Sequence, residues 1–278
     1  MPWHEITIET PEVIKDAVIG ELTELGAGGV WESGEDQITA YFESLPNFNS
    51  VETLFERAGL PIPEITNSAV PDKDWGEEFK KSWGSLPLGT RFFIIPSWLD
   101  TPCPPGRLPI FIDPGQAFGT GTHESTQLTL EAMERFIQPD GAIFDLGTGS
   151  GILAIAAVLL GGKNVAGSDN DPIAIEVAQE NVDRNVPGKI RLEVGTLDSL
   201  EDGSVDLLLC NLTADVITSL YEDIHRVLRP QGLAIFSGVL NFQAPGILQL
   251  ASTHGHTLLE HTQRGEWCAL VVRNANGR

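Results

Sequence analysis

A glycine-rich turn near the middle of the chain sets the strongest limit on its fold. The run Asp145-Leu146-Gly147-Thr148-Gly149-Ser150-Gly151 joins a predicted strand at 142–146 directly to a predicted helix at 152–160. Glycines at such a turn let the backbone bend sharply and approach a ligand closely. Asp169 stands at the end of the next predicted strand, 22 residues after Gly147. A carboxylate in that position accepts hydrogen bonds from ribose hydroxyls, so the sequence predicts a nucleoside-binding site.

Strands and helices alternate through the second half of the chain. Strands are predicted at 142–146, 164–168, 189–194, 205–210 and 233–237, and helices at 125–136, 152–160, 172–185 and 214–228, with a short helical turn at 197–200. This alternation indicates a doubly wound parallel sheet covered by helices. Only a short turn, 263–266, separates two last strands at 256–260 and 267–273, so these form an antiparallel hairpin. Upstream, strands at 92–95 and 109–112 flank a proline-rich stretch, 101–109, which predicts another hairpin.

The spacing of the glycines distinguishes between two kinds of nucleoside cofactor. Nicotinamide dinucleotide sites follow G-x-G-x-x-G, whereas this chain has G-x-G-x-G, with Ile152 in place of the third glycine. A terminal antiparallel hairpin is also foreign to that family, but it is usual in S-adenosylmethionine-dependent methyltransferases. We therefore predict an α/β class I methyltransferase fold with a doubly wound seven-stranded sheet. A nicotinamide-dependent oxidoreductase and a non-catalytic nucleoside-binding adaptor remain as alternatives.

The first 70 residues predict a separate small domain. Strands are expected at 3–9, 29–33, 37–43 and 62–70, and helices at 11–25 and 50–58. The order β-α-β-β-α-β is that of a ferredoxin-like α+β unit. A linker helix is expected at 71–84, where Trp75, Phe79 and Trp83 follow a helical spacing, and residues 85–278 form the larger domain.

The chain is strongly acidic, and its acidity is uneven. It has 17 Lys+Arg and 39 Asp+Glu, a formal net charge of -22. Residues 1–70 hold 2 basic and 13 acidic side chains, a net charge of -11, and the other 208 residues hold 15 and 26, also -11. Such a charge argues against stable binding of nucleic acid or an anionic membrane. It favours a basic partner for residues 1–70.

The remaining composition predicts a cytoplasmic enzyme. The amino terminus has neither the basic nor the apolar region of a secretory signal. The longest apolar run, 152–160, is far shorter than the roughly 20 residues that a membrane span needs. Cys103, Cys210 and Cys268 are odd in number and form no C-x-x-C pair, which is typical of a reducing compartment.

Several segments together resemble one family of methyltransferases. They are 74–83 (DWGEEFKKSW), 91–98 (RFFIIPSW), 113–126 (DPGQAFGTGTHEST), the glycine-rich run 145–157, and Asn211-Leu212-Thr213-Ala214. The combination is similar to the bacterial methyltransferases of large-subunit ribosomal protein eleven, over the whole chain. This resemblance implies S-adenosylmethionine as cofactor and a basic ribosomal protein as substrate. It implies methyl transfer to lysine side chains and the N-terminal α-amine, giving trimethylated products, with the acidic N-terminal domain recognising the substrate.

The resemblance also implies a role for each residue of a cofactor site. Phe118 would pack on the cofactor, Thr126 would contact its methionine end, Gly147 and Gly149 would give close backbone approach, Asp169 would bind the ribose, and Asn211 would lie beside the transferable methyl group. Thr148 departs from the usual family pattern at a position where only the backbone matters. Thr213 also departs from it, and this departure puts details of the acceptor pocket in doubt. The alternative acceptor, another protein or RNA, therefore stays open.

Catalytic and metal-binding roles are less defined by the sequence. No catalytic residue is assigned, although His123, the only histidine inside a motif, suits a hydrogen-bonding loop anchor or a proton acceptor. His254 and His256 are two residues apart with no third ligand nearby, so no metal site is predicted.

Overall fold

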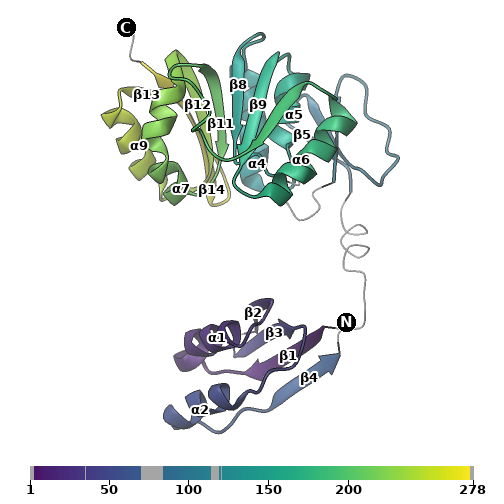
Figure 1. Cartoon of the computed structure of the whole chain (residues 1–278), viewed down its shortest axis with the longest axis vertical. Helices are drawn as coiled ribbons and strands as arrows, with labels where there is room; N and C mark the ends of the chain where they lie inside the picture. The colour runs from purple at the N-terminus through teal and green to yellow at the C-terminus, as the bar shows by residue number, and fades with distance from the viewer. Residues whose placement is uncertain (1–2, 35, 70–83, 114–118, 120, 276–278) are drawn as a thin grey trace. The chain divides into compact units, whose positions relative to one another are not determined.

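The chain divides into two compact units, Met1–Ser82 and Trp83–Arg278 (Figure 1). The computed structural model describes residues 3–34, 36–69, 84–113, 119 and 121–275. The linker helix expected at 71–84 lies outside the described residues, except for Gly84. No helix within these described ranges has the length and apolar character needed to cross a membrane.

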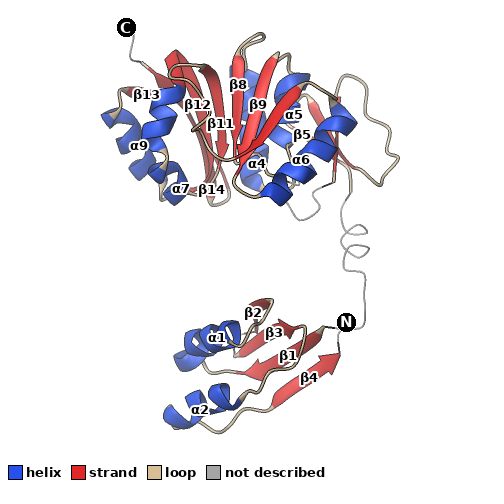
Figure 2. Cartoon of the chain, viewed as in Figure 1, coloured by secondary structure: helices blue, strands red, loops and turns tan. Residues whose placement is uncertain are grey.

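The N-terminal unit is an antiparallel sheet with two helices (Figure 2). Its elements are β1 (His4–Glu9), the 3-10 turn η1 (Glu12–Ile14), α1 (Lys15–Glu24), β2 (Gly29–Gly34), β3 (Gln37–Phe42), α2 (Asn49–Arg57) and β4 (Ile65–Ala69). The strand order β2-β3-β1-β4 is the ferredoxin-like order that the sequence predicts. Alternating side chains of β1 and β3, such as Ile6, Ile8 and Ile38, form one core with α1 and α2 because successive strand residues point to opposite faces.

A seven-stranded sheet forms the centre of the second unit and confirms the predicted fold class. Its strands are β8 (Ala142–Leu146), β9 (Asn164–Asp169), β10 (Ile190–Val194), β11 (Val205–Asn211), β12 (Leu228–Leu240), β13 (His256–Arg264) and β14 (Trp267–Asn274). They lie in the order β10-β9-β8-β11-β12-β14-β13. The first five strands run parallel, and β14 pairs antiparallel with both β12 and β13. The terminal hairpin is therefore present as predicted.

Helices cover both faces of this sheet because its strands are apolar on both sides. The helices are α4 (Glu124–Phe136), α5 (Ile152–Leu159), α6 (Pro172–Asn185), α7 (Ala214–Ser219), α8 (Tyr221–Val227) and α9 (Ala244–Thr253). Residues of α4, α5 and α6 share one buried core with Ile143 and Val165. Residues of α7, α8 and α9 share a second core with Phe144 and Phe236. Neighbouring residues of one strand, Ile143 and Phe144, thus enter different cores.

Three predictions for the second half of the sheet need correction. The helix predicted at 214–228 is two helices, which meet at Leu220 so that both Ile217 and Tyr221 reach the core. The strand β12 begins at Leu228, earlier than predicted, because Leu228 pairs with Val205 before the chain turns at Gln231. The helix α9 was not predicted, since Pro and Gly occupy its first turn.

The hairpin predicted around the proline-rich stretch 101–109 is wrong. A small sheet contains β5 (Leu86–Leu88), β6 (Phe92–Pro96) and β7 (Leu108–Ile112), and β6 pairs with β7 in parallel. The connection is long enough to return the chain to the start of β6, where the Leu108 amide donates to the Arg91 carbonyl at 2.6 Å. The Arg107 guanidinium also donates to the Phe92 carbonyl at 2.7 Å. The connection between β6 and β7 is therefore long enough for a parallel crossover, although the local sequence pattern does not indicate one.

Candidate functional site

The glycine-rich turn after β8 has a left-handed backbone at three positions. Gly147, Gly149 and Gly151 have φ of 71°, 53° and 82°. The Gly147 and Thr148 amides both donate to the Ser168 carbonyl of β9, at 2.8 and 2.9 Å, which fixes the turn beside the next strand. A Cβ atom on Gly147 would overlap the Leu212 side chain, so this position requires glycine for space as well as for conformation.

The predicted ribose ligand, Asp169, ends β9 beside this turn. One carboxylate oxygen accepts from the Gly149 amide at 3.0 Å, and the other accepts from the Asp171 amide at 3.1 Å. These bonds hold the half-buried carboxylate at the carboxyl edge of the sheet. A carboxylate has several acceptor positions, so Asp169 retains capacity for ribose hydroxyls.

Asn211 is the last residue of β11 and is hydrogen-bonded to a residue of α4. Its side-chain amide group donates to the Thr126 hydroxyl oxygen at 3.3 Å. Its Oδ1 atom is buried and has no hydrogen-bond partner in the described structure. A buried acceptor without a donor costs free energy, so Asn211 is arranged to receive an N–H or O–H group from a ligand.

A cavity of about 420 Å³ brings most of these residues together. Its lining comprises His123, Ser125, Gly147, Gly149, Asp169, Asp171, Ala174, Asn211, Leu212, Thr213, Gly238 and Trp267. Thr126 is absent from this lining because it is completely buried behind Asn211. Phe118 lies outside the described residues. The neighbouring Gly119 carbonyl accepts from the Ser150 hydroxyl at 2.6 Å, which attaches this loop to the glycine-rich turn.

His123 serves as the cap of helix α4. Its Nδ1 atom accepts from the Ser125 amide at 3.3 Å and lies 2.8 Å from the Ser125 hydroxyl. A backbone amide only donates, so Nδ1 is the acceptor in this cap. The ring also contacts Trp267 edge-on, with centroids 4.7 Å apart. These contacts support the loop-anchor interpretation of His123.

Asp145 lies beneath the glycine-rich turn and is completely buried. Burial raises the pKa of this carboxyl to about 7, although one of its oxygens accepts from the Thr148 hydroxyl at 2.7 Å and the Ala154 amide at 3.2 Å. The nearby charge of Asp169 acts in the same direction as burial. Thr148, which departs from the usual family pattern, thus contributes a side-chain hydrogen bond to the turn.

Sequence reasoning missed Gly238 and Trp267 in the cavity wall. Gly238 lies near the carboxyl end of β12 with φ of 76°, and a Cβ atom there would lie 2.6 Å from the Leu212 carbonyl oxygen. Trp267 begins β14 opposite Leu240. The sequence could have pointed to Gly238 as a cavity residue, because a glycine at the carboxyl end of a parallel strand allows close approach. Trp267 has no comparable local signal, because only the antiparallel hairpin brings it to this edge.

His254 and His256 belong to a different cluster, around Tyr221. The Tyr221 hydroxyl lies 3.0 Å from His256 Nδ1, and His225 Nδ1 lies 2.9 Å from His256 Nε2. His254 instead pairs with Glu222 at 3.0 Å. Among the residues that the structure describes, no group of His, Cys, Asp or Glu has an arrangement suited to a metal ion.

The cavity has the features that an adenosyl cofactor requires. Glycines leave space for close backbone approach, Asp169 offers acceptors for ribose hydroxyls, and Asn211 offers an unsatisfied oxygen. The strand order, the terminal antiparallel hairpin and this cavity at the carboxyl edge define the class as class I S-adenosylmethionine-dependent methyltransferases. The family model described as ribosomal protein L11 methyltransferase (PrmA) matches residues 4–275. The chain belongs to this family, and S-adenosylmethionine is its cofactor.

Individual relatives agree with this family over nearly the whole chain. The ribosomal protein L11 methyltransferase of Streptococcus pyogenes serotype M3 is 33% identical, with 99% of this chain and 96% of the relative covered. That of Synechococcus elongatus is 35% identical, with 97% and 96% covered. A crystal structure of the ribosomal protein L11 methylase from Lactobacillus delbrueckii subsp. bulgaricus is also similar. It has a TM-score of 0.64 at 33% identity, covering 68% of this chain and 98% of that one.

Proposed function

We propose that this protein transfers methyl groups from S-adenosylmethionine to amine nitrogens of ribosomal protein L11. The acceptors are lysine side chains and the N-terminal α-amine, and the products are trimethylated. The observation that carries this proposal is that Asn211 lines one cavity with the glycine-rich turn and Asp169, and that its buried Oδ1 atom has no hydrogen-bond partner among the described residues. The names of the relatives supply the identity of the substrate.

Binding of the cofactor rests on the residues of the glycine-rich turn and β9. Asp169 accepts hydrogen bonds from the ribose hydroxyls, while Gly147 and Gly149 let the cofactor approach their backbone. The resemblance to the family assigns Phe118 to packing on the cofactor and Thr126 to its methionine end. S-adenosylmethionine supplies a methyl group on a sulfonium centre, so its leaving group needs no proton.

Asn211 orients the acceptor amine. Its side-chain amide is held by Thr126, so Oδ1 has a fixed direction for accepting an N–H bond. This contact directs the nitrogen lone pair toward the methyl group, and such positioning is the main catalytic contribution in a direct displacement. The contact requires an N–H group on the acceptor, which the unmodified and the monomethylated amine provide. The neutral dimethylated amine has no N–H group, so the last methyl transfer takes place without this hydrogen bond.

The acceptor amine must lose a proton before it attacks. The reference pKa of a lysine ammonium is about 10.4, and removal from water lowers it. Leu212 and Trp267 form apolar parts of the cavity wall and remove water from the amine. His123 Nδ1 is already used as a helix cap, so desolvation rather than this atom promotes deprotonation.

The N-terminal unit recognises the substrate through charge. Its acidic side chains Glu9, Glu24, Glu43, Glu56 and Glu64 are all exposed. An acidic surface attracts a basic ribosomal protein and repels RNA, which favours capture of the substrate before its assembly with rRNA. The same charge argues against stable nucleic-acid or membrane binding, and the expected setting is the cytoplasm.

Label transfer tests this function directly. Purified protein is incubated with methyl-labelled S-adenosylmethionine, purified L11 and, separately, RNA. We expect label on L11 amines, with Asn211→Ala lowering kcat about 2–10-fold, which corresponds to about 0.5–1.5 kcal/mol for one hydrogen bond between neutral groups. Affinity for S-adenosylhomocysteine should change little in this variant. Gln249→Ala, on the exposed side of α9, is the matched control. Label on RNA alone would contradict the proposal.

A further inference from the structure

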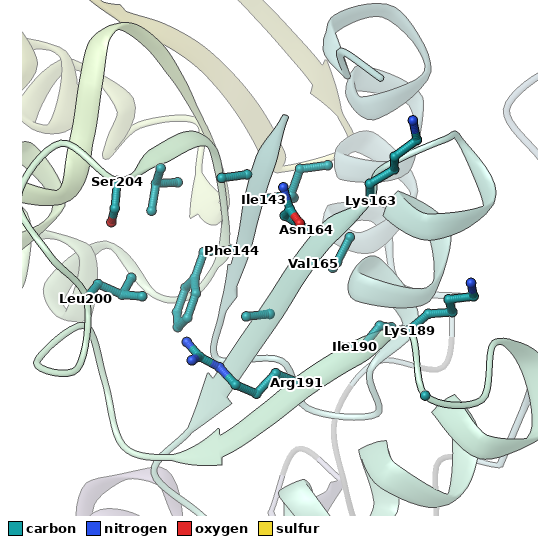
Figure 3. A pocket seen from close by; sticks show the side chains of 14 residues that line it. Ile143, Phe144, Lys163, Asn164, Val165, Lys189, Ile190, Arg191, Leu200 and Ser204 are labelled. Atoms are coloured by element: carbon teal, nitrogen blue, oxygen red, sulfur yellow. The ribbon is translucent and has the colours of Figure 1, made fainter. Parts of the chain in front are cut away.

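A second cavity, of about 500 Å³, opens beside the amino-terminal halves of β8, β9 and β10. Phe144, Ala166 and Leu200 supply apolar parts of its lining, and Lys163, Lys189 and Arg191 supply charged parts (Figure 3). The cofactor cavity is lined by Gly147 and Asp169, at the opposite ends of β8 and β9. None of the described residues lines both cavities.

This second cavity exists because one connection lacks a helix. Residues 195–204, between β10 and β11, contain only turns, one closed by the Leu200 amide and the Leu197 carbonyl at 3.1 Å. Phe144, Ala166 and Arg191 are register neighbours across β8, β9 and β10, so their side chains share the face that this connection leaves open. The opposite face is packed under α5 and α6.

The charge of the lining is opposite to that of the chain. Acidic side chains outnumber basic ones by 39 to 17, yet three cationic side chains and no acidic one are among the described residues that line this cavity. Lys163 has an ion pair with Asp140. Within the described part of the chain, the exposed Lys189 and Arg191 side chains have no acidic partner.

The positions of the cations suit a ligand with an anionic group and an apolar body. Arg191 reaches from β10 toward Phe144 and Leu200, while Lys163 and Lys189 stand at the starts of β9 and β10 (Figure 3). A guanidinium offers a planar fork of donors that matches phosphate geometry, and lysine adds a mobile positive charge. A volume of this size is that of ordinary small-molecule sites.

We infer that this cavity is a second ligand site, which binds a phosphate ester of nucleotide size. The phosphate lies against the Arg191 guanidinium, and the organic part lies against Leu200 and the apolar face of the sheet. Lys163 and Lys189, whose side chains point away from Arg191, add positive charge at the rim of the cavity (Figure 3). A long polyanion is disfavoured because the rest of the chain carries a large negative charge. The ligand is therefore a small molecule rather than a nucleic acid. This inference does not depend on the acceptor of the methyl group.

Calorimetric titration tests the site without any activity measurement. The probes are uridine monophosphate and guanosine monophosphate, added to protein whose cofactor cavity is saturated with S-adenosylhomocysteine. We expect saturable 1:1 binding of at least one nucleotide with Kd below about 1 mM. Uridine and guanosine without phosphate, and inorganic phosphate alone, should each bind at least about tenfold more weakly, because each lacks one part of the recognition.

Variants assign the binding to this cavity. Arg191→Gln should weaken nucleotide binding at least about tenfold, since it removes the fork of donors. Arg184→Gln removes the same charge from the exposed end of α6, outside the cavity, and should leave the affinity within about twofold. Three results would overturn the inference: no saturable binding of either nucleotide, equal affinity in Arg191→Gln and the unmodified protein, or binding that disappears when S-adenosylhomocysteine fills the cofactor cavity.

Discussion

Substitution of Gly147 by alanine should damage both the stability of the second unit and its cofactor site. Gly147 has φ of 71°, and the added Cβ would overlap the Leu212 side chain. A left-handed backbone costs an alanine roughly 1–2 kcal/mol, and overpacking typically adds about 1–3 kcal/mol. We therefore expect Gly147→Ala to lower the free energy of unfolding by about 2–5 kcal/mol. The affinity for S-adenosylhomocysteine should fall at least about tenfold, because Leu212 lines the cavity.

The substitution Gly106→Ala separates the cost of the left-handed backbone from the cost of the overlap with Leu212. Gly106 has φ of 83°, and a Cβ atom there would meet nothing within 4 Å. This control should lose only the backbone contribution, about 1–2 kcal/mol, and keep normal cofactor affinity. Scanning calorimetry measures the difference, since about 1 kcal/mol shifts Tm by roughly 2–4 °C in a unit of this size.

A double-mutant cycle with Leu212→Ala tests the overlap itself. Leu212→Ala removes the side chain that the new Cβ would meet, so the double variant should be more stable than the sum of the single effects predicts, by about 1–3 kcal/mol. The reasoning is refuted if Gly147→Ala is no less stable than Gly106→Ala. It is also refuted if the cycle shows no coupling between Gly147 and Leu212.

Two further predictions concern charged groups. Asp169→Ala should weaken S-adenosylhomocysteine binding by roughly 1–3 kcal/mol in calorimetric titration, because it removes charged acceptors, whereas Asp183→Ala, on the exposed face of α6, should have no effect. Burial and the neighbouring histidines lower the pKa of His256 from 6.5 to about 4, so the unfolded chain binds more protons between these pH values. The contribution of His256 to the free energy of unfolding should therefore decrease by up to about 3 kcal/mol as pH falls from about 6.5 to 4, whereas the raised pKa of Asp145 acts in the opposite direction over the same range. His254, whose pKa is raised by the Leu250 carbonyl and Glu222, opposes part of this loss. Chemical denaturation at a series of pH values gives the free energy of unfolding as a function of pH. Its slope against pH should be smaller in His256→Gln than in the unmodified protein, and unchanged in the exposed control His261→Gln. Equal slopes in these two variants and the unmodified protein would exclude His256 as the cause.

The sequence by itself determined the nucleoside-binding unit and its class. The glycine-rich turn, the acid Asp169 at the next strand end and the alternation of strands and helices are local patterns. Each one depends on residues that are close in the chain, where backbone conformation and hydrophobic periodicity act directly. The motif of the family added the site residues Phe118, Thr126 and Asn211, whose contacts with a cofactor remain predictions.

Only the tertiary structure decided which distant segments meet. The parallel pairing of β6 with β7 depends on Arg107 returning to the carbonyls near Phe92, and no local pattern indicates the direction of that return. His123 contacts Trp267, 144 residues further along the chain, and this contact completes a cavity wall that the sequence did not identify. The cationic cavity beside Arg191 likewise arises from the register of three strands and a missing helix. Such contacts depend on the packing of the whole sheet, because loop closure permits many alternative pairings of similar local sequences.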